Sequence, residues 1–239
     1  MNKIKVKILQ YGDLAESVDY EYIKNFKSSL FEIVGVEKKN LWNTKNDYDY
    51  CTYPDNEWKK HIKKKESNIG LVLVLTNALL EDGFYARRLS DCLVVFSFAR
   101  IFSFLKEAHI GLENVIIKTL YEYSLIYENL YNSSIWHHAT NGCLYDMDGN
   151  LADIALTCRE PHICDVCKGE LLKSGVSEEK IYLVEKEIKK LKISWIYRLL
   201  EWVERHPLWS LGISAFFAII CGIISDILYD IIKNNLLHF

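Results

Sequence analysis

The sequence predicts an α/β domain of the α+β kind, built on a small mixed sheet and followed by helices that lead to a membrane. Short apolar runs alternate with stretches of helical period in the first part of the chain. A group of cysteine and histidine residues then has the spacing of a zinc site, and a run of 18 uncharged residues lies near the C-terminus. We therefore expect a globular domain at 1–175, an amphipathic linker helix at 176–206, and a transmembrane anchor with a short tail at 207–239.

The composition indicates a reducing compartment and gives no reason to expect a nucleic-acid partner. The chain has 239 residues and a net charge of −3, so it lacks a basic excess. Its cysteines number seven, and its N-terminus alternates lysine with apolar residues, without the uninterrupted apolar core of a secretory signal. In the cytoplasm, clustered cysteines favour a bound metal over disulfides.

Four stretches supply the expected core of the domain. Residues 3–9 alternate between lysine and apolar residues, which predicts a strand. Residues 19–34 have apolar positions at helical spacing. The runs at 70–77 and 92–100 are continuously apolar, as in strands that are buried on both faces of a sheet.

The remaining stretches are predicted to be loops and helices. Residues 40–56 and 139–163 are rich in polar and turn-forming residues and are predicted to be loops. Residues 101–135 are predicted to be helical, in one or two pieces with a break near 109–111. A long amphipathic helix is expected from about 177 to 206, where Pro207 ends or kinks it.

A zinc-binding pattern is the strongest chemical signal. Cys164 and Cys167 form a CxxC pair, which can hold two corners of a tetrahedral Zn²⁺ ion. We predict that His138 and Cys143 supply the other two ligands. Four protein ligands close a zinc site to substrate, so we expect one structural zinc ion per chain.

Two other ligands and two other readings of the cysteines remain open from the sequence. His162 and Cys158 lie close enough along the chain to replace a predicted ligand. A redox CxxC motif usually opens a helix after a strand, whereas Cys164 follows a loop that contains Pro161. Free buried thiols are the second alternative.

The run from Leu208 to Ser225 predicts a single membrane-spanning helix. Its 18 residues carry no charge and reach about 27 Å as a helix, close to the hydrocarbon thickness. Trp202 and Trp209 precede or open the run and Tyr229 follows it, as interfacial aromatic residues do. A buried core helix is the alternative.

The distribution of basic residues predicts the orientation. Only Lys233 lies after the run, whereas several basic residues precede it, namely Lys186, Lys189, Lys190, Lys192, Arg198 and Arg205. Basic residues stay on the cytoplasmic side. We therefore expect a single-pass protein of the inner (cytoplasmic) membrane with its N-terminal domain in the cytoplasm.

One stripe of the predicted span favours helix association. Ser214, Ala218, Gly222 and Asp226 recur every four residues, and small residues at this spacing let helices approach closely. An acidic residue at the end of such a stripe prefers a partner or water to lipid. A homo-oligomer through the span, up to a pore, is one expectation, and a plain anchor is the other.

The zinc pattern and the residues before it resemble the archaemetzincin family of small zinc peptidases. That family has an active-site helix with the pattern HExxHxxGxxH, followed directly by a cysteine tetrad. In the stretch 127–137, Glu128 stands at the glutamate position and His137 at the third histidine. His138 stands where the family has its first tetrad cysteine, and the predicted zinc ligands Cys143, Cys164 and Cys167 follow at matching spacing.

The resemblance implies a metzincin-like domain over about residues 1–175 whose catalytic site is degenerate. Two of the three metal positions are Tyr127 and Tyr131, and Ser134 replaces the turn glycine. A phenol is a poor zinc ligand at neutral pH because its pKa is about 10. The implied protein is a pseudoenzyme that keeps the tetrad as a structural zinc site.

We therefore expect a membrane-anchored, catalytically inactive zinc-binding module that recognises a cytoplasmic ligand or protein partner. Small bacterial domains with terminal spans resemble effectors of anti-phage defence, so a membrane-acting effector is a more specific form of this expectation, on architecture alone. One alternative is a membrane-anchored zinc metallopeptidase or other hydrolase, which a second zinc ion per chain would favour. The other is a structural scaffold protein, which a monomeric span would favour.

Overall fold

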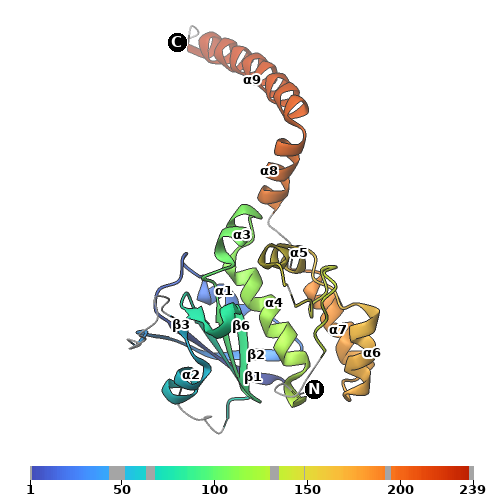
Figure 1. Ribbon diagram of the computed structural model, residues 1–239. Coiled ribbons are helices and arrows are strands. Elements are labelled where there is room, and N and C mark those ends of the chain that lie inside the picture. Colours follow the sequence, from blue (N-terminus) through green and yellow to red (C-terminus); the bar gives the residue numbers. More distant parts are fainter. Residues whose placement is uncertain are drawn as a thin grey trace. The chain divides into compact units, whose positions relative to one another are not determined.

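The computed structural model describes residues 2–42, 52–62, 68–129, 135–147, 149–191 and 195–236. The chain divides into two compact units, Met1–Lys192 and Ile193–Phe239. The first unit holds the sheet and the cysteine cluster, and the described part of the second consists of helices α8 and α9 (Figure 1).

A five-stranded mixed sheet forms the centre of the first unit and confirms the predicted α/β class. In spatial order the strands are β2 (Phe31–Lys39), β1 (Ile4–Tyr11), β4 (Leu71–Thr76), β7 (Leu93–Ser97) and β6 (Ala86–Ser90). The first four are parallel, and β6 pairs antiparallel with β7. A separate parallel pair joins β3 (Thr52–Tyr53) to β5 (Leu79–Leu80). The strands predicted at 3–9, 70–77 and 92–100 correspond to β1, β4 and β7.

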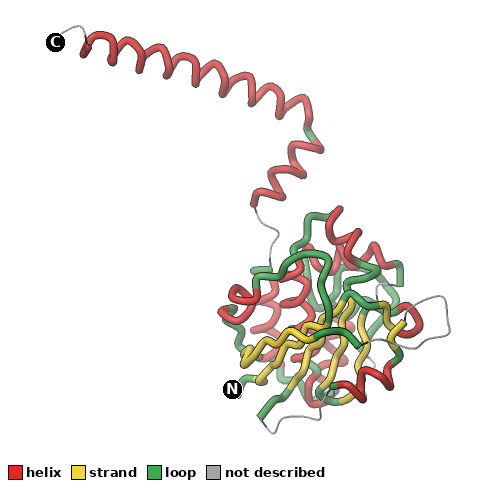
Figure 2. Tube along the Cα trace, turned by 90° about the vertical axis from the view of Figure 1, so that its left-hand side faces the viewer, coloured by secondary structure: helices red, strands yellow, loops and turns green. Residues whose placement is uncertain are grey.

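Alternate residues of the central strands contribute to two separate cores. In β4, Leu73 and Leu75 belong to the larger core, whereas Val74 between them belongs to the smaller one. Successive side chains of a strand point to opposite faces, so a strand covered on both faces needs a continuously apolar run. The larger core includes α4 (Leu112–Leu125), and the smaller includes Trp58 of α2 (Asp55–His61). Figure 2 shows helices on both sides of the sheet.

The helical stretch predicted over 101–135 is broken where expected but ends earlier. Helix α3 (Phe102–Glu107) is followed by His109, whose φ of 54° is left-handed and stops the helix. Helix α4 then begins at Leu112 and ends at Leu125, and a single 3₁₀ turn, η2 (Tyr127–Asn129), follows. Most residues of α4 are buried, so this helix lies against the sheet along nearly its whole length.

The helix predicted over 19–34 is correct only in its first part. Helix α1 (Tyr20–Asn25) is capped by the side chain of Asp19, but residues from Phe31 onward form β2 instead. The register of β2 against β1 shifts between Ile33 and Gly35, which leaves Val34 as an extra, exposed residue. The extra apolar residue interrupts the alternation of apolar and polar residues along the strand. The spacing of apolar residues in the sequence therefore resembles that of a helix.

The long helix predicted over 177–206 is two helices in the structure. Helix α7 (Glu178–Ile188) buries Ile181, Val184 and Ile188 in the larger core and ends before residue 189. Residues 192–194 lie outside the described part, and α8 (Trp195–Arg205) begins after them. The first unit therefore extends to Lys192, beyond the expected boundary at 175, because α7 packs on the domain and does not act as a linker.

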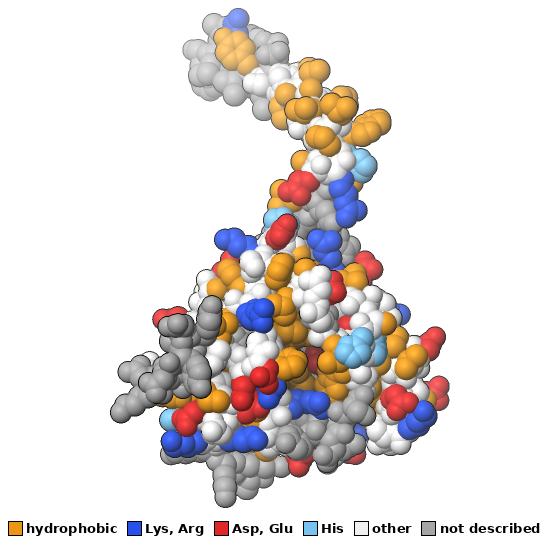
Figure 3. Space-filling model, in the orientation of Figure 1, with side chains coloured by type: hydrophobic (Ala, Val, Ile, Leu, Met, Phe, Trp, Pro, Cys, Tyr) orange, Lys and Arg blue, Asp and Glu red, His pale blue; other side chains and the backbone are white. Residues whose placement is uncertain are grey.

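The second unit contains the predicted span. Helix α9 (Pro207–Leu236) includes Pro207–Ser225, with a mean hydropathy of 2.1 and none of its residues buried. By length and composition this helix can cross a membrane. Its hydrophobic side chains lie on the surface, as Figure 3 shows in orange. Ser214, Ala218 and Gly222 are exposed, and the side chain of Asp226 lies outside the described residues.

Candidate metal centre

Three cysteines and one histidine from separate segments meet in the first unit. The possible ligand atoms of His137, Cys143, Cys164 and Cys167 all lie within 4.8 Å of one another. Cys143 and Cys167 are fully buried, and the His137 side chain is 20% exposed. Among the described residues, this is the one group of His, Cys, Asp and Glu side chains close enough to hold a metal ion.

Backbone pairing brings two of these segments together. Cys143 and His162 form an isolated parallel bridge, in which the N–H of Leu144 donates to the carbonyl of His162 at 2.7 Å. Gly142 precedes Cys143 with a φ of 85°, a conformation that glycine adopts without strain. The chain therefore turns sharply at Gly142 and carries the Cys143 thiol toward the CxxC segment.

The CxxC pair sits at the start of a helix, where thiolates are favoured. Cys164 is the N-cap of α6 (Asp165–Lys173), and its Sγ accepts a hydrogen bond from the N–H of Cys167 at 3.5 Å. The N–H of Cys164 donates to Cys143 Sγ at 3.4 Å. Backbone N–H groups and the positive end of the helix dipole both stabilise a negative sulfur.

The thiols of Cys143 and Cys167 interact, and each changes the pKa of the other. A hydrogen bond from Cys167 is the main cause that lowers the pKa of Cys143 to about 4, against the opposing effect of burial. The same bond raises the pKa of Cys167. Cys143 is thus poised as a thiolate, which is the form that binds a metal.

Asp146 contacts both the backbone turn at Cys143 and the imidazole of His137. Its Oδ2 accepts hydrogen bonds from the N–H groups of Asn141, Gly142 and Cys143 at 2.8 to 3.0 Å, which fixes the turn. Its Oδ1 lies 3.4 Å from His137 Nε2, is buried, and has no hydrogen-bond partner among the described residues. A buried carboxylate oxygen in this state favours a cation beside the imidazole. Three sulfurs and one imidazole nitrogen are a donor set that suits zinc.

The structure places His137, and not the predicted His138, in the cluster. His138 is exposed. The backbone at His137 is bridged to Asp146, with the N–H of Met147 donating to the His137 carbonyl at 3.0 Å. Neighbouring side chains of an extended segment point to opposite sides, so only one of the two histidines can face the thiols. The alternates His162 and Cys158 are not in the cluster; Cys158 is buried in α5 (Ile154–Arg159).

The described residues among those assigned to a degenerate active-site helix do not share an α-helix. Tyr127 and Glu128 lie in the turn η2 after α4 has ended, Tyr131 and Ser134 lie outside the described residues, and His137 belongs to the metal cluster. Glu128 is exposed and lies 3.8 Å from Lys180 Nζ. The described members of the motif therefore do not converge on a second metal site.

A buried ion pair on α4 was not found from the sequence. Lys118 Nζ donates to Glu122 Oε2 at 2.9 Å, and the two side chains are only 3% and 8% exposed. The indole Nε1 of Trp136 lies 3.4 Å from Glu122 Oε1, and the guanidinium of Arg88 lies 3.8 Å above the Trp136 ring. The sequence pattern that could have predicted this pair is two opposite charges four residues apart within a largely apolar helix.

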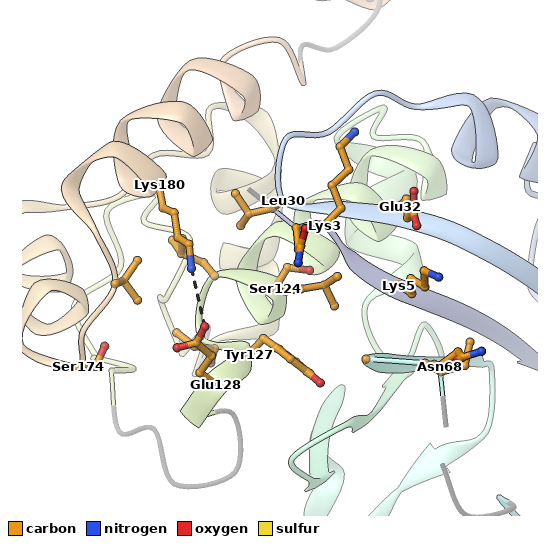
Figure 4. A pocket seen from close by; sticks show the side chains of 17 residues that line it. Lys3, Lys5, Leu30, Glu32, Asn68, Ser124, Tyr127, Glu128, Ser174 and Lys180 are labelled. Carbon is orange, nitrogen blue, oxygen red and sulfur yellow. Dashed lines mark ion pairs between the residues drawn. The ribbon is translucent and has the colours of Figure 1, made fainter. Parts of the chain in front are cut away.

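A pocket of about 710 Å³ opens at the amino ends of β1, β2 and β4 (Figure 4). Its apolar lining includes Leu30, Ile69 and Ile126, and its polar lining includes three lysines and two glutamates, namely Lys3, Lys5, Lys180, Glu32 and Glu128. Ser124 also lines it, and its Oγ is buried without a hydrogen-bond partner among the described residues. The volume falls within the range of small-molecule sites.

Comparison with known proteins does not assign this chain to a family. No protein-family model matches it, and no curated protein matches it. Among solved structures it is similar to archaemetzincin from Methanopyrus kandleri, with 15% sequence identity, 72% of this chain and 95% of that chain covered, and a TM-score of 0.49. These values describe a partial likeness in fold, and the roles of the residues follow from this chain's own geometry.

Proposed function

We propose that this protein is a membrane-anchored binding module in which one structural zinc ion joins His137, Cys143, Cys164 and Cys167, and that it has no peptidase activity. The closed arrangement of four protein ligands carries the proposal. A catalytic zinc site keeps a position open for water or substrate, whereas a structural site uses four protein ligands.

The location of the cluster supports a structural role. The residues between Ile135 and Cys167 form turns, bridges and short helices, with little regular structure of their own. Bound zinc would join the turn at Cys143 to the start of α6 and so stabilise this part of the domain. Cys143 and Cys167 are fully buried, which shields their sulfurs from substrates and oxidants.

The pocket supports recognition of a small cytoplasmic ligand. Three lysines against two glutamates favour an anionic group, and the apolar floor suits a ligand with an apolar portion. Of the three pocket lysines, Lys180 forms an ion pair with Glu128 at 3.8 Å. Lys3 and Lys5 make no ion pair with a described residue. Among the described residues that line the pocket, Ser124 has a buried hydroxyl without a hydrogen-bond partner, and this hydroxyl would gain a partner on binding.

Anchoring rests on α9 and on the distribution of basic residues around it. The window Pro207–Ser225 has no buried residue, which is unlike the core helix of a soluble domain. The excess of lysine and arginine before it supports a cytoplasmic first unit. Association through Ser214, Ala218 and Gly222 is a further part of the proposal, whereas a role in anti-phage defence rests on domain order alone and is not included.

Zinc content and peptidase activity of the full chain test the proposal. The protein would be purified in detergent as wild type, as Cys164→Ser, and as the control Cys221→Ser, which removes an exposed cysteine of α9. We expect one zinc ion per chain in the wild type and the control, loss of zinc in Cys164→Ser, and no cleavage of casein or peptide libraries.

Two zinc ions per chain together with chelator-sensitive cleavage would overturn the proposal in favour of a membrane-anchored zinc hydrolase. Zinc-free wild type that keeps its fold would overturn the structural zinc ion. A protein that stays soluble and monomeric without detergent would overturn the anchoring.

A further inference from the structure

Helix α8 has an apolar face that is open to its surroundings. Leu199, Leu200, Trp202 and Val203 are 50%, 43%, 38% and 37% exposed, although large apolar side chains in a helix usually lie in a core. Their positions along α8 place them on one face of the helix. Glu201 falls on the opposite side of the helical wheel, so α8 is strongly amphipathic.

Helix α8 is joined to the candidate span by one residue. Only His206 lies between α8 and α9, and its N–H still donates to the carbonyl of Trp202 at 3.0 Å. Pro207 lacks an N–H and therefore cannot continue α8, and it is the first residue of α9. When α9 crosses a bilayer from Pro207, the C-terminal end of α8 is held within one helical turn of the membrane surface.

We propose that α8 lies in the headgroup region of the bilayer, with the face formed by Leu199, Leu200, Trp202 and Val203 turned toward the acyl chains. This inference rests on the proposed anchoring by α9. The charged residues of α8 exclude it from the hydrocarbon core, and its apolar face is disfavoured in water. At the membrane–water interface the apolar face contacts acyl chains while the charged face contacts headgroups and water. Tryptophan is enriched at this interface.

The charge of α8 indicates which lipids it needs. The helix contains two basic and two acidic residues, namely Arg198, Arg205, Glu201 and Glu204, so its net charge is zero. Attraction to anionic headgroups therefore adds little, in contrast to polybasic segments. Apolar burial alone holds the helix, and phosphatidylcholine is a sufficient partner.

Photo-crosslinking of the full chain in phosphatidylcholine vesicles tests this placement. The photoreactive residue p-benzoyl-phenylalanine would replace Trp202 on the apolar face or, as the matched control, Glu201 at the opposite position of the helical wheel. The same residue in place of Phe217, an exposed residue within α9, reports on anchoring. We expect several-fold more lipid adduct at position 202 than at 201, a strong adduct at 217, and no change when phosphatidylglycerol is added to the vesicles.

Each other outcome overturns the inference in a distinguishable way. Lipid adducts at 217 but not at 202 would leave the anchor intact and remove α8 from the interface. Adducts with protein alone at 202 would mean that another protein surface covers this face. The absence of lipid adducts at 217 would defeat the anchoring together with the inference.

Hydrogen exchange provides a second measurement with natural residues. Leu200→Glu places a charge on the apolar face, and we expect faster amide exchange over residues 199–206 in vesicles than in the wild type. The control Glu201→Gln changes the opposite, polar side of the helix and should leave exchange unchanged. Equal exchange in all three proteins would contradict the interfacial placement.

Discussion

Replacement of His137 by alanine would separate the metal ligand seen in the structure from its neighbour in the sequence. His137 Nε2 lies 3.5 Å from Cys164 Sγ, whereas His138 is exposed. Zinc at 1,000 times its Kd stabilises a folded protein by about 4 kcal/mol. For a domain of this size, 1 kcal/mol corresponds to roughly 2–4 °C in Tm. Loss of the metal should therefore lower Tm by about 8–16 °C, the product of these two values.

The assay combines zinc content with thermal unfolding followed by circular dichroism, for the wild type, His137→Ala and His138→Ala. We expect His138→Ala to keep one zinc ion per chain and the Tm of the wild type. His137→Ala should lose the zinc ion, and its Tm should equal that of the wild type treated with a chelator. Cobalt substitution of the wild type should give the absorption of a tetrahedral site with thiolate ligands. Retention of zinc by His137→Ala, with loss in His138→Ala, would refute the assignment.

Three further predictions follow from other parts of the molecule. Lys118→Met leaves Glu122 buried without its cationic partner and should cost roughly 3–5 kcal/mol of stability in urea unfolding. The double variant Lys118→Met with Glu122→Leu should recover most of this loss, and a double variant no better than the single one would contradict the buried pair. If the small-residue stripe of α9 mediates association, Gly222→Leu should lower the yield of cross-linked dimer and Gly212→Leu, off the stripe, should not; equal yields would exclude the stripe. Burial raises the pKa of Tyr20 to about 12, so the stability that it contributes is complete below about pH 10 and is lost as the pH rises toward its folded pKa. Tyr20→Phe should flatten this fall in urea midpoints between about pH 9 and 11, and an unchanged slope would argue against the shift.

The sheet was predictable where burial alone determines the pattern. Strands β4 and β7 are covered on both faces, so their apolar runs can be recognised without knowledge of their neighbours. Strand β2 was not recognised, because the bulge at Val34 breaks its alternation and the parallel partner that produces the bulge is distant in sequence. Strand β6 was missed as well, since its arginines give it little apolar character.

The metal site was predictable in its chemistry but not in its full ligand set. The CxxC pair constrains two ligands through local geometry, and Cys143 follows from its spacing. The choice between His137 and His138 depends on which side of an extended segment faces the thiols, and this is set by the bridge to Asp146. The resemblance placed His137 on the active-site helix, because it assumed an uninterrupted helix through residues 127–137. In the structure α4 ends at Leu125.

The bulge in β2 also bears on how copies of this protein would behave if α9 gathers them on a membrane surface. A sheet edge exposes unpaired N–H and C=O groups, and a second copy can extend the sheet there. At one edge, the irregular step at Val34 and the charged end Glu37–Lys39 interrupt any long, regular pairing. At the other edge, Arg87 is held by Asp55 and Arg88 lies over Trp136, so β6 is short and charged. Both edges of the described sheet therefore disfavour its extension by a second copy, also at high surface density.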